Sequence, residues 1–470
     1  MATCVLQGAY GRGCDTSVAD VLKAEAVQST LRALVVAYAF PPVGGAGVQR
    51  MSKLVKYLPS HDVSPTVLTV ANPSVPLRDT SFAGDLPVGV EVVRARTFEP
   101  GYGMKEAAWA ASASPSTPLR RAVRGLSSIA KQVLLPDPQV LWVPAAEAAL
   151  ARRLVRRDDD VVLVSGPPFS QFLLAPLARA RKGVGVVLDY RDEWSTYRAS
   201  YEMTASRSAR LAGDLLEPAL LRCAHRITTA TDEFREQLLR RYRFLSSEQV
   251  IAIPNGYDPS DFPPDLPAPP PDRFLMTYAG TVFRLTGVRG LLGAIRRLHE
   301  SEPELARLLH VQFLGRIVDT ERHFFAGAEA LGVSTKPYVP HEDVLAALSA
   351  SHLTLCVLDD VPGTERILPA KIFELMHLGR PILTMAPDGA LTRLVRRHTL
   401  GDVVAPRDEE GIASLLAERL RAFRAASAGS PERRGISRNS ATGIERFHRR
   451  ALAGEFASVL REARADAARA

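Results

Sequence analysis

The sequence predicts two α/β domains, each a Rossmann-like, doubly wound parallel sheet, facing each other across a central cleft. Three observations lead to this prediction. The 470 residues, 46% of them hydrophobic, suffice for two ordinary cores. The same order of strand, turn and helix begins at Leu31 and again at Phe274. Between these two points, residues 259–272 contain seven prolines in fourteen positions, which is typical of a semi-rigid linker.

These features divide the chain into five predicted parts. The parts are an N-terminal arm at 1–30, a first domain at 31–258, the linker at 259–271, a second domain at 272–435 and a terminal helix at 436–470. The terminal stretch has apolar residues in a helical rhythm, and we expect it to cross back to the first domain.

Composition restricts the classes of function. The longest apolar runs are strand-sized, far below the ~20 residues that a membrane helix needs. No secretory pattern opens the chain, and the four cysteines lack pairing or metal-type spacing, so we expect a cytoplasmic protein. The formal charge of +8 is spread over arginine-rich helices without interleaved aromatic residues, which argues against nucleic-acid binding. Residues 119–134 predict a basic amphipathic helix, either an ordinary surface helix or a peripheral contact with an anionic membrane.

The first strand, 31–39, leads into a glycine-rich turn and a helix that opens near Val48. The turn contains Gly44, Gly45, Ala46 and Gly47. Glycines let a backbone approach an anion closely, and the helix start supplies unpaired N–H groups. The turn is therefore either a phosphate-binding loop or a merely structural tight turn.

Two further strands end in polar and aromatic clusters. The strand at 161–164 is followed by Ser165 and Phe169, and the strand at 185–189 delivers Asp189, Arg191, Asp192 and Trp194. Ligands of open α/β sheets bind beyond the carboxyl ends of the strands. We therefore assign Asp189, Arg191 and Asp192 to orienting an acceptor or a sugar hydroxyl, and Ser165, Phe169 and Trp194 to acceptor binding. The alternative is a structural Arg–Asp pair at a strand end.

The second domain opens with a strand at 274–279 and a turn at Thr281, followed by Arg284 and Arg289. An arginine fork can bind two oxygens of a diphosphate at once. Another predicted strand, 311–314, ends at Gly315.

The most informative stretch is 368–383. Its apolar residues predict a helix that ends at Gly379, before Pro381. Glu374 lies close to the helix start, where a carboxylate can accept paired hydrogen bonds from a vicinal diol such as ribose. The alternative is a solvated helix residue.

This stretch, with Pro387-Asp388-Gly389-Ala390 after it, resembles the donor-site signature of the retaining GT-B glycosyltransferases of family 4, in their polysaccharide or natural-product branch. The resemblance implies that Glu374 holds the nucleotide ribose. It also implies a donor-binding role for further residues: Gly44, Gly45, Ala46, Gly47, Thr281, Gly315, Val339, Leu368 and Lys371. Arg284 and Arg289 match two basic residues that stabilise the leaving diphosphate.

Two departures accompany the resemblance. The family's first glutamate would fall at Arg366, with Glu365 one residue further off, and its histidine after the Val161 strand is replaced by Ser and Phe. Asp189 and Asp192 also lack the spacing of an Asp-x-Asp metal motif.

The implied activity is retaining transfer of a sugar from a UDP- or GDP-linked donor, without cofactor or metal ion. The acceptor is a glycan or lipid-linked intermediate, or else a secondary metabolite or small thiol. The departures also leave open a catalytically weak nucleotide-sugar-binding scaffold. An epimerase or trehalose-type synthase of the same shape is a further alternative.

Overall fold

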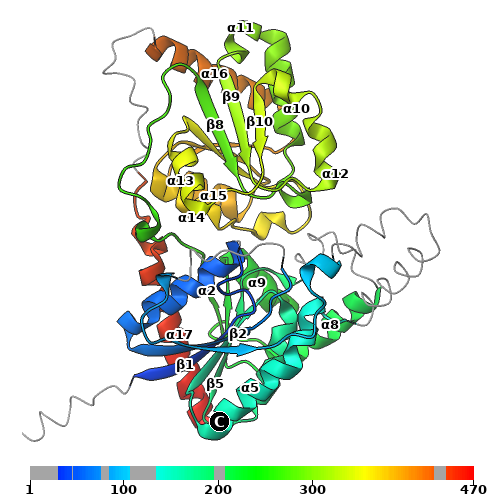
Figure 1. The fold of residues 1–470 in the computed structure, drawn as a ribbon, viewed down its shortest axis with the longest axis vertical. Coiled ribbons are helices and arrows are strands. Elements are labelled where there is room, and N and C mark those ends of the chain that lie inside the picture. The colour runs from blue at the N-terminus through cyan, green and yellow to red at the C-terminus, as the bar shows by residue number, and fades with distance from the viewer. Residues whose placement is uncertain (1–29, 45, 76–83, 106–133, 195–206, 428–440) are drawn as a thin grey trace, which may run out of the picture.

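The chain forms two α/β domains, one above the other in Figure 1, around two separate parallel sheets. The computed structural model describes residues 30–44, 46–75, 84–105, 134–194, 207–427 and 441–470. Residues 1–29 of the predicted arm, 1–30, and residues 119–133 of the predicted basic helix lie outside these ranges. The predicted fold class, two Rossmann-like parallel-sheet domains, is confirmed.

The first sheet has seven parallel strands in the order β3-β2-β1-β4-β5-β6-β7. Their bounds are β1 Leu31–Val36, β2 Val63–Val70, β3 Glu91–Ala95, β4 Val161–Gly166, β5 Gly185–Tyr190, β6 Arg226–Thr229 and β7 Val250–Ala252. Strands β4 and β5 are buried along their whole length because helices cover both faces of the sheet.

Each face of this sheet has its own helices. One core lies under α5 Val143–Arg156, α6 Ala175–Arg179, α8 Arg207–Leu221 and α9 Asp232–Arg241. The other lies under α2 Ala46–Tyr57 and α17 Arg449–Arg469. A 3-10 turn at Phe169–Leu174 lies between β4 and α6. The helix α6 begins with Pro176 in its first turn, where a proline needs no N–H partner.

The second sheet has six parallel strands in the order β10-β9-β8-β11-β12-β13. They are β8 Phe274–Ala279, β9 Leu309–Leu314, β10 Val333–Lys336, β11 Leu353–Val357, β12 Ile382–Met385 and β13 Gly401–Val404. One face packs on α10 Arg289–Ser301, α11 Pro303–Ala306 and α16 Glu409–Ser427. The other packs on α13 His341–Ser349, α14 Lys371–Leu378 and α15 Ala390–Arg397. A short helix, α12 Asp319–Arg322, follows β9.

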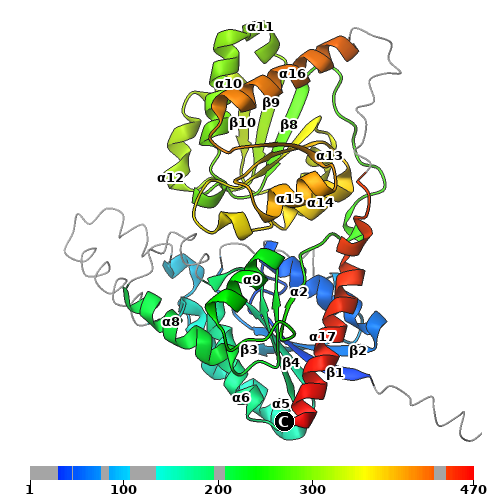
Figure 2. The same ribbon diagram turned by 180° about the vertical axis from the view of Figure 1, so that it is seen from behind.

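The last helix, α17, runs along the first domain and packs against α2 and β5 (Figure 2). Gly185 makes this packing possible, since a Cβ there would lie 2.8 Å from the backbone of Ala463. The chain thus passes between the domains twice, and the two passages are hydrogen-bonded side by side. Tyr257 N–H donates to the Phe447 carbonyl at 3.0 Å, and Arg449 N–H donates to the Tyr257 carbonyl at 2.9 Å.

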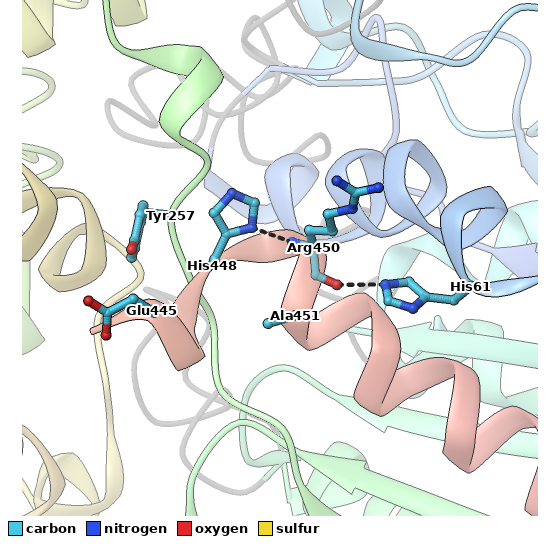
Figure 3. A pocket seen from close by; sticks show the side chains of 6 residues that line it. All are labelled: His61, Tyr257, Glu445, His448, Arg450 and Ala451. Atoms are coloured by element: carbon cyan, nitrogen blue, oxygen red, sulfur yellow. Dashed lines mark hydrogen bonds between the residues drawn. The ribbon is translucent and has the colours of Figure 1, made fainter. Parts of the chain in front are cut away.

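A hollow adjoins this double passage (Figure 3). Its lining consists of His61, Tyr257, Glu445, His448, Arg450 and Ala451. His61 Nε2 is 2.9 Å from the Arg450 carbonyl, which joins the 3-10 turn after α2, Leu58–His61, to the start of α17. None of the residues predicted for the functional site lines this hollow. Among the described helices, none is long and apolar enough to cross a membrane.

Candidate functional site

The carboxyl ends of both sheets face the junction between the domains, and the predicted donor residues gather there. Glu374 lies in the first turn of α14, which ends at Gly379 in the left-handed conformation. Its Oε1 accepts hydrogen bonds from Gln49 Nε2 of the first domain at 3.2 Å and from His341 Nε2 at 3.0 Å. Within the described residues, Oε2 of Glu374 has no hydrogen bond. The carboxylate therefore bridges the two domains and retains an unused acceptor.

The charge state of this carboxylate follows from its neighbours. Burial acts to raise the pKa of Glu374, but the hydrogen bond and charge of His341 outweigh it and lower the pKa below its ordinary value. For His341, burial acts to lower the pKa, and the hydrogen bond and charge of Glu374 outweigh it and raise the pKa. The charged forms of the two groups thus stabilise each other.

Lys371 and two glycines close the adjoining side of the site. The Lys371 ammonium lies 4.0 Å from the ring centroid of Tyr278, at the end of β8. Gly280 has a φ of 136°, a backbone conformation that residues with side chains rarely adopt, and a Cβ there would lie 2.5 Å from that ammonium and displace it. Gly315 is similar, with a φ of 132° and a would-be Cβ 2.5 Å from the Gly280 carbonyl oxygen. The carboxyl ends of β8 and β9 and the start of α14 therefore lie close together.

Arg284 and Arg289 stand at the start of the helical segments after β8, and both are exposed. The Arg289 guanidinium lies 5.7 Å from the ring centroid of Phe324. Arg284 has neither a hydrogen bond nor an ion pair within the described ranges. Thr281 is exposed, and its carbonyl accepts hydrogen bonds from Tyr278 Oη and Thr286 Oγ1. Arg284 is thus a cation available to an anionic ligand.

Three further predicted donor residues, Gly44, Val339 and Leu368, lie in loops. Val339, just before α13, and Leu368, before α14, are half-buried. Gly44 is half-buried in the loop before α2, whereas Gly45 and the side chain of Ala46 lie outside the described part of the chain.

Arg191 fastens the glycine-rich loop. Its guanidinium donates to the carbonyls of Gly47 and Pro167, and its main-chain N–H donates to the Gly166 carbonyl at 2.9 Å. A Cβ on Gly47 would lie 3.1 Å from Arg191 Nη1, so the loop is packed on the arginine. The prediction of a catalytic Arg191 is corrected to a positioning role, because its N–H groups are committed to backbone oxygens.

Asp189 is also a positioning residue. Its carboxylate is fully buried and accepts hydrogen bonds from Arg50 at 2.9 and 3.2 Å, and from Ser165 and Thr228 at 2.8 Å each. Burial acts to raise the pKa of Asp189, but the charge and hydrogen bonds of Arg50 outweigh it and lower the pKa. The catalytic prediction for Asp189 and the acceptor-binding prediction for Ser165 are therefore wrong. Asp192, by contrast, is exposed.

Phe169 and Trp194 belong to the core. Their rings stack at 4.6 Å between centroids, and each side chain is 1% exposed. Side chains buried to this extent cannot contact an acceptor, so the acceptor-binding prediction for both residues is wrong.

Several residues at the junction were missed by the sequence analysis. They are Gln49 and His341 on either side of Glu374, and the pair formed by Glu193 and Arg366 across the junction at 2.8 Å. Arg449, the first residue of α17, is buried nearby, and burial together with the charge of Arg50 lowers its pKa to about 10. Of these residues, only Arg366 stood out in the sequence, because it occupies the position where the family has its first glutamate. No group of three or more His, Cys, Asp or Glu side chains is placed to bind a metal ion within the described residues.

Residues 44–256 match the family described as glycosyl transferase 4-like domain. No curated protein matches the sequence significantly.

Solved structures match over nearly the whole chain. Sucrose-phosphate synthase from Thermosynechococcus elongatus is 16% identical, with a TM-score of 0.58 over 92% of this chain and 98% of that one. WaaG, a glycosyltransferase involved in lipopolysaccharide biosynthesis, is 16% identical, with a TM-score of 0.55 over 91% and 99%. An E. coli structure described as trehalose-6-phosphate bound with UDP-2-fluoro glucose is 12% identical, with a TM-score of 0.55 over 91% and 98%. At these identities the matches establish the fold.

Proposed function

Since residues 44–256 match the glycosyl transferase 4-like domain and the fold is that of the GT-B glycosyltransferases, we propose that this chain is a family 4 type enzyme that transfers a sugar, with retention of configuration, from a nucleoside-diphosphate sugar to an acceptor nucleophile. The observation that carries the donor proposal is Glu374. It is a half-buried carboxylate at the domain junction, ionised by its neighbours, with one oxygen unengaged within the described residues. Such a group suits the two hydroxyls of a ribose.

The nucleoside diphosphate is proposed to be UDP- or GDP-linked. The uridine form is supported by the E. coli structure that holds UDP-2-fluoro glucose. The diphosphate would lie between Lys371 and Arg284 of the second domain and the start of α2, whose free N–H groups and dipole favour an anion.

The transfer step makes one bond and breaks one bond at the anomeric carbon. The bond to the diphosphate oxygen breaks and its electron pair leaves with the phosphate, while the acceptor oxygen or sulfur bonds to the same carbon. In the retaining reaction the acceptor attacks from the face that the phosphate leaves, and the departing phosphate takes the acceptor's proton. Arg284 and Arg289 stabilise the developing charge, so we propose that the reaction needs neither a metal ion nor a cofactor.

For the acceptor we propose one of two classes: a glycan or lipid-linked intermediate, or a secondary metabolite or small thiol. We also keep the cytoplasm as the proposed compartment, with the membrane contact of residues 119–134 as a separate proposal.

A second candidate function is a catalytically weak nucleotide-sugar-binding scaffold. It is favoured by Arg366, which stands in place of a glutamate and points its guanidinium to Glu193. Binding would then persist without turnover.

Thermal melting with UDP, GDP, ADP, CMP and dTDP tests the proposal. A nucleotide that binds only the folded chain raises the melting temperature by mass action. One diphosphate should raise it in the native protein and much less in Glu374→Gln. Turnover of the matching nucleotide sugar then separates the enzyme from the scaffold. No shift with any of the five nucleotides would refute the donor site.

A further inference from the structure

Arg366 links the donor side of the second domain to the first domain through its side chain. It ends a 3-10 turn, Thr364–Arg366, between β11 and α14. Its Nε and Nη2 donate to Oε2 of Glu193 at 3.2 and 2.8 Å, and Nη1 contacts Glu365. Glu193 follows the carboxyl end of β5 in the first sheet. The side chains of Arg366 and Glu193 are 21% and 11% exposed, so the pair is largely shielded from water.

The main chain of the same residue is attached as well. The Arg366 carbonyl accepts a hydrogen bond from Thr231 Oγ1 at 2.9 Å. Thr231 is itself fixed, because its Oγ1 caps α9 by accepting from Phe234 N–H at 3.1 Å. The side chain of Arg366 thus contacts Glu193, just after β5, and its backbone contacts Thr231, at the start of α9. Both partners belong to the first domain.

The segment that carries Arg366 leads directly into the candidate site. On its own domain it is packed tightly, since a Cβ on Gly389 would meet the Glu365 carbonyl oxygen at 2.1 Å. The chain continues from Arg366 through 367–370 to Lys371 and Glu374. A displacement of the 363–370 segment therefore moves the ammonium and the carboxylate proposed to bind the donor.

A second ion pair crosses the junction and provides a contrast. Arg393 on α15 contacts Glu233 on α9 through Nε at 3.1 Å, but its side chain is 50% exposed and that of Glu233 is 25% exposed. Exposed pairs contribute little, whereas breaking a shielded pair leaves an uncompensated charge. The two pairs join the same domains and differ mainly in solvent exposure and in the segment that they hold.

We propose that Glu193 and Arg366 are positioning residues of the transfer reaction. Their pair fixes the 363–370 segment against the first domain, and so sets Lys371 and Glu374 in the arrangement that the bound donor needs for transfer. This role rests on the proposed function, and neither residue needs to touch the reacting atoms.

A double-mutant cycle tests the coupling. Glu193→Gln and Arg366→Gln should each lower kcat at least about tenfold, with a smaller change in the donor KM, because the reacting geometry is lost more than binding. The double variant should be no slower than the slower single variant, since either change already releases the segment. Arg366→Lys, which keeps the charge and loses the fork, should fall between the native protein and Arg366→Gln. In the control cycle, Glu233→Gln and Arg393→Gln should each change kcat less than about twofold.

Hydrogen exchange measured without substrate separates this inference from the proposed function. The reporters are the amides of Arg366, Ile367 and Ile372, which donate to backbone carbonyls within the segment at 3.0 to 3.2 Å. They should exchange faster in Glu193→Gln than in the native protein and remain unchanged in Glu233→Gln. Unchanged exchange in Glu193→Gln, or a native kcat in that variant, would overturn the inference. If the native protein shows no turnover but exchange is faster in Glu193→Gln, the proposed function is overturned. The attachment of the 363–370 segment to the first domain is then still demonstrated.

Discussion

Replacing Glu374 with glutamine is the most direct test of the donor site. The change keeps the size of the side chain, and the remaining carbonyl oxygen can still accept from Gln49 or His341. It removes the negative charge and turns one oxygen into an N–H donor, which cannot accept a ribose hydroxyl. Loss of a hydrogen bond to a charged group costs about 1.5–3 kcal/mol. Since about 1.4 kcal/mol corresponds to a factor of ten, the donor Kd should rise by roughly ten- to a hundredfold.

Isothermal titration with the nucleoside diphosphate identified by melting measures this Kd, and steady-state kinetics measures the donor KM. The matched control is Glu418→Gln, which makes the same chemical change at an exposed position of α16, at the far end of the second domain (Figure 1). The control should change the Kd less than about twofold, as expected of a surface charge outside the site. A Kd in Glu374→Gln within the same twofold would refute the ribose contact, provided that both variants melt like the native protein.

Three further predictions concern charge. Arg284→Ala should lower kcat by about a hundredfold and raise the donor KM much less, because the arginine acts on charge that develops in the transition state; equal changes in both constants would contradict this role. His341 has a raised pKa in the folded chain, so its charge should stabilise the fold fully below its ordinary pKa of about 6.5 and lose that effect as the pH rises through the folded pKa. The excess unfolding free energy over His341→Gln should shrink in that pH range, and a constant difference in chemical denaturation would count against the ion pair with Glu374. Arg50→Met leaves Asp189 buried without its cation and should destabilise the first domain by about 3–5 kcal/mol in calorimetry; an unchanged melting temperature would contradict that account.

The sequence was sufficient for the fold class because both sheets carry local signals. The strand β8 has the predicted bounds 274–279, and the helix that holds Glu374 ends at Gly379 as predicted. Both depend on short-range features, namely an apolar run and a glycine in the left-handed conformation. The strands β10 and β13 were not predicted, since their residues are largely exposed or half-buried and give no apolar run. The order of the strands in each sheet is set by tertiary packing, which no local pattern contains.

The errors at the site have a common physical cause. Asp189 and Trp194 were assigned to ligands because they lie at or just after the end of a strand. The strand β5 runs to Tyr190 and is buried on both faces, so alternation along it does not tell which side chain reaches the edge of the sheet. From the sequence alone, a buried aspartate that pairs with an arginine cannot be distinguished from a catalytic aspartate. Only the four hydrogen bonds to its carboxylate distinguish the two.

Gln49 and Glu193, two of the residues that sequence reasoning missed, have their partners in the other domain. Gln49 lies 325 positions from Glu374, and Glu193 lies 173 positions from Arg366. Taken alone, Gln49 is an ordinary residue in the first turn of α2, and Glu193 is one more charge after a strand. Each motif predicts its own half of the site. Both Glu374, which is proposed to hold the ribose, and the 363–370 segment before it form hydrogen bonds across the junction. A change in the relative position of the two domains must therefore alter the donor site itself, which is why the variants that break these contacts are expected to change kcat without touching the reacting atoms.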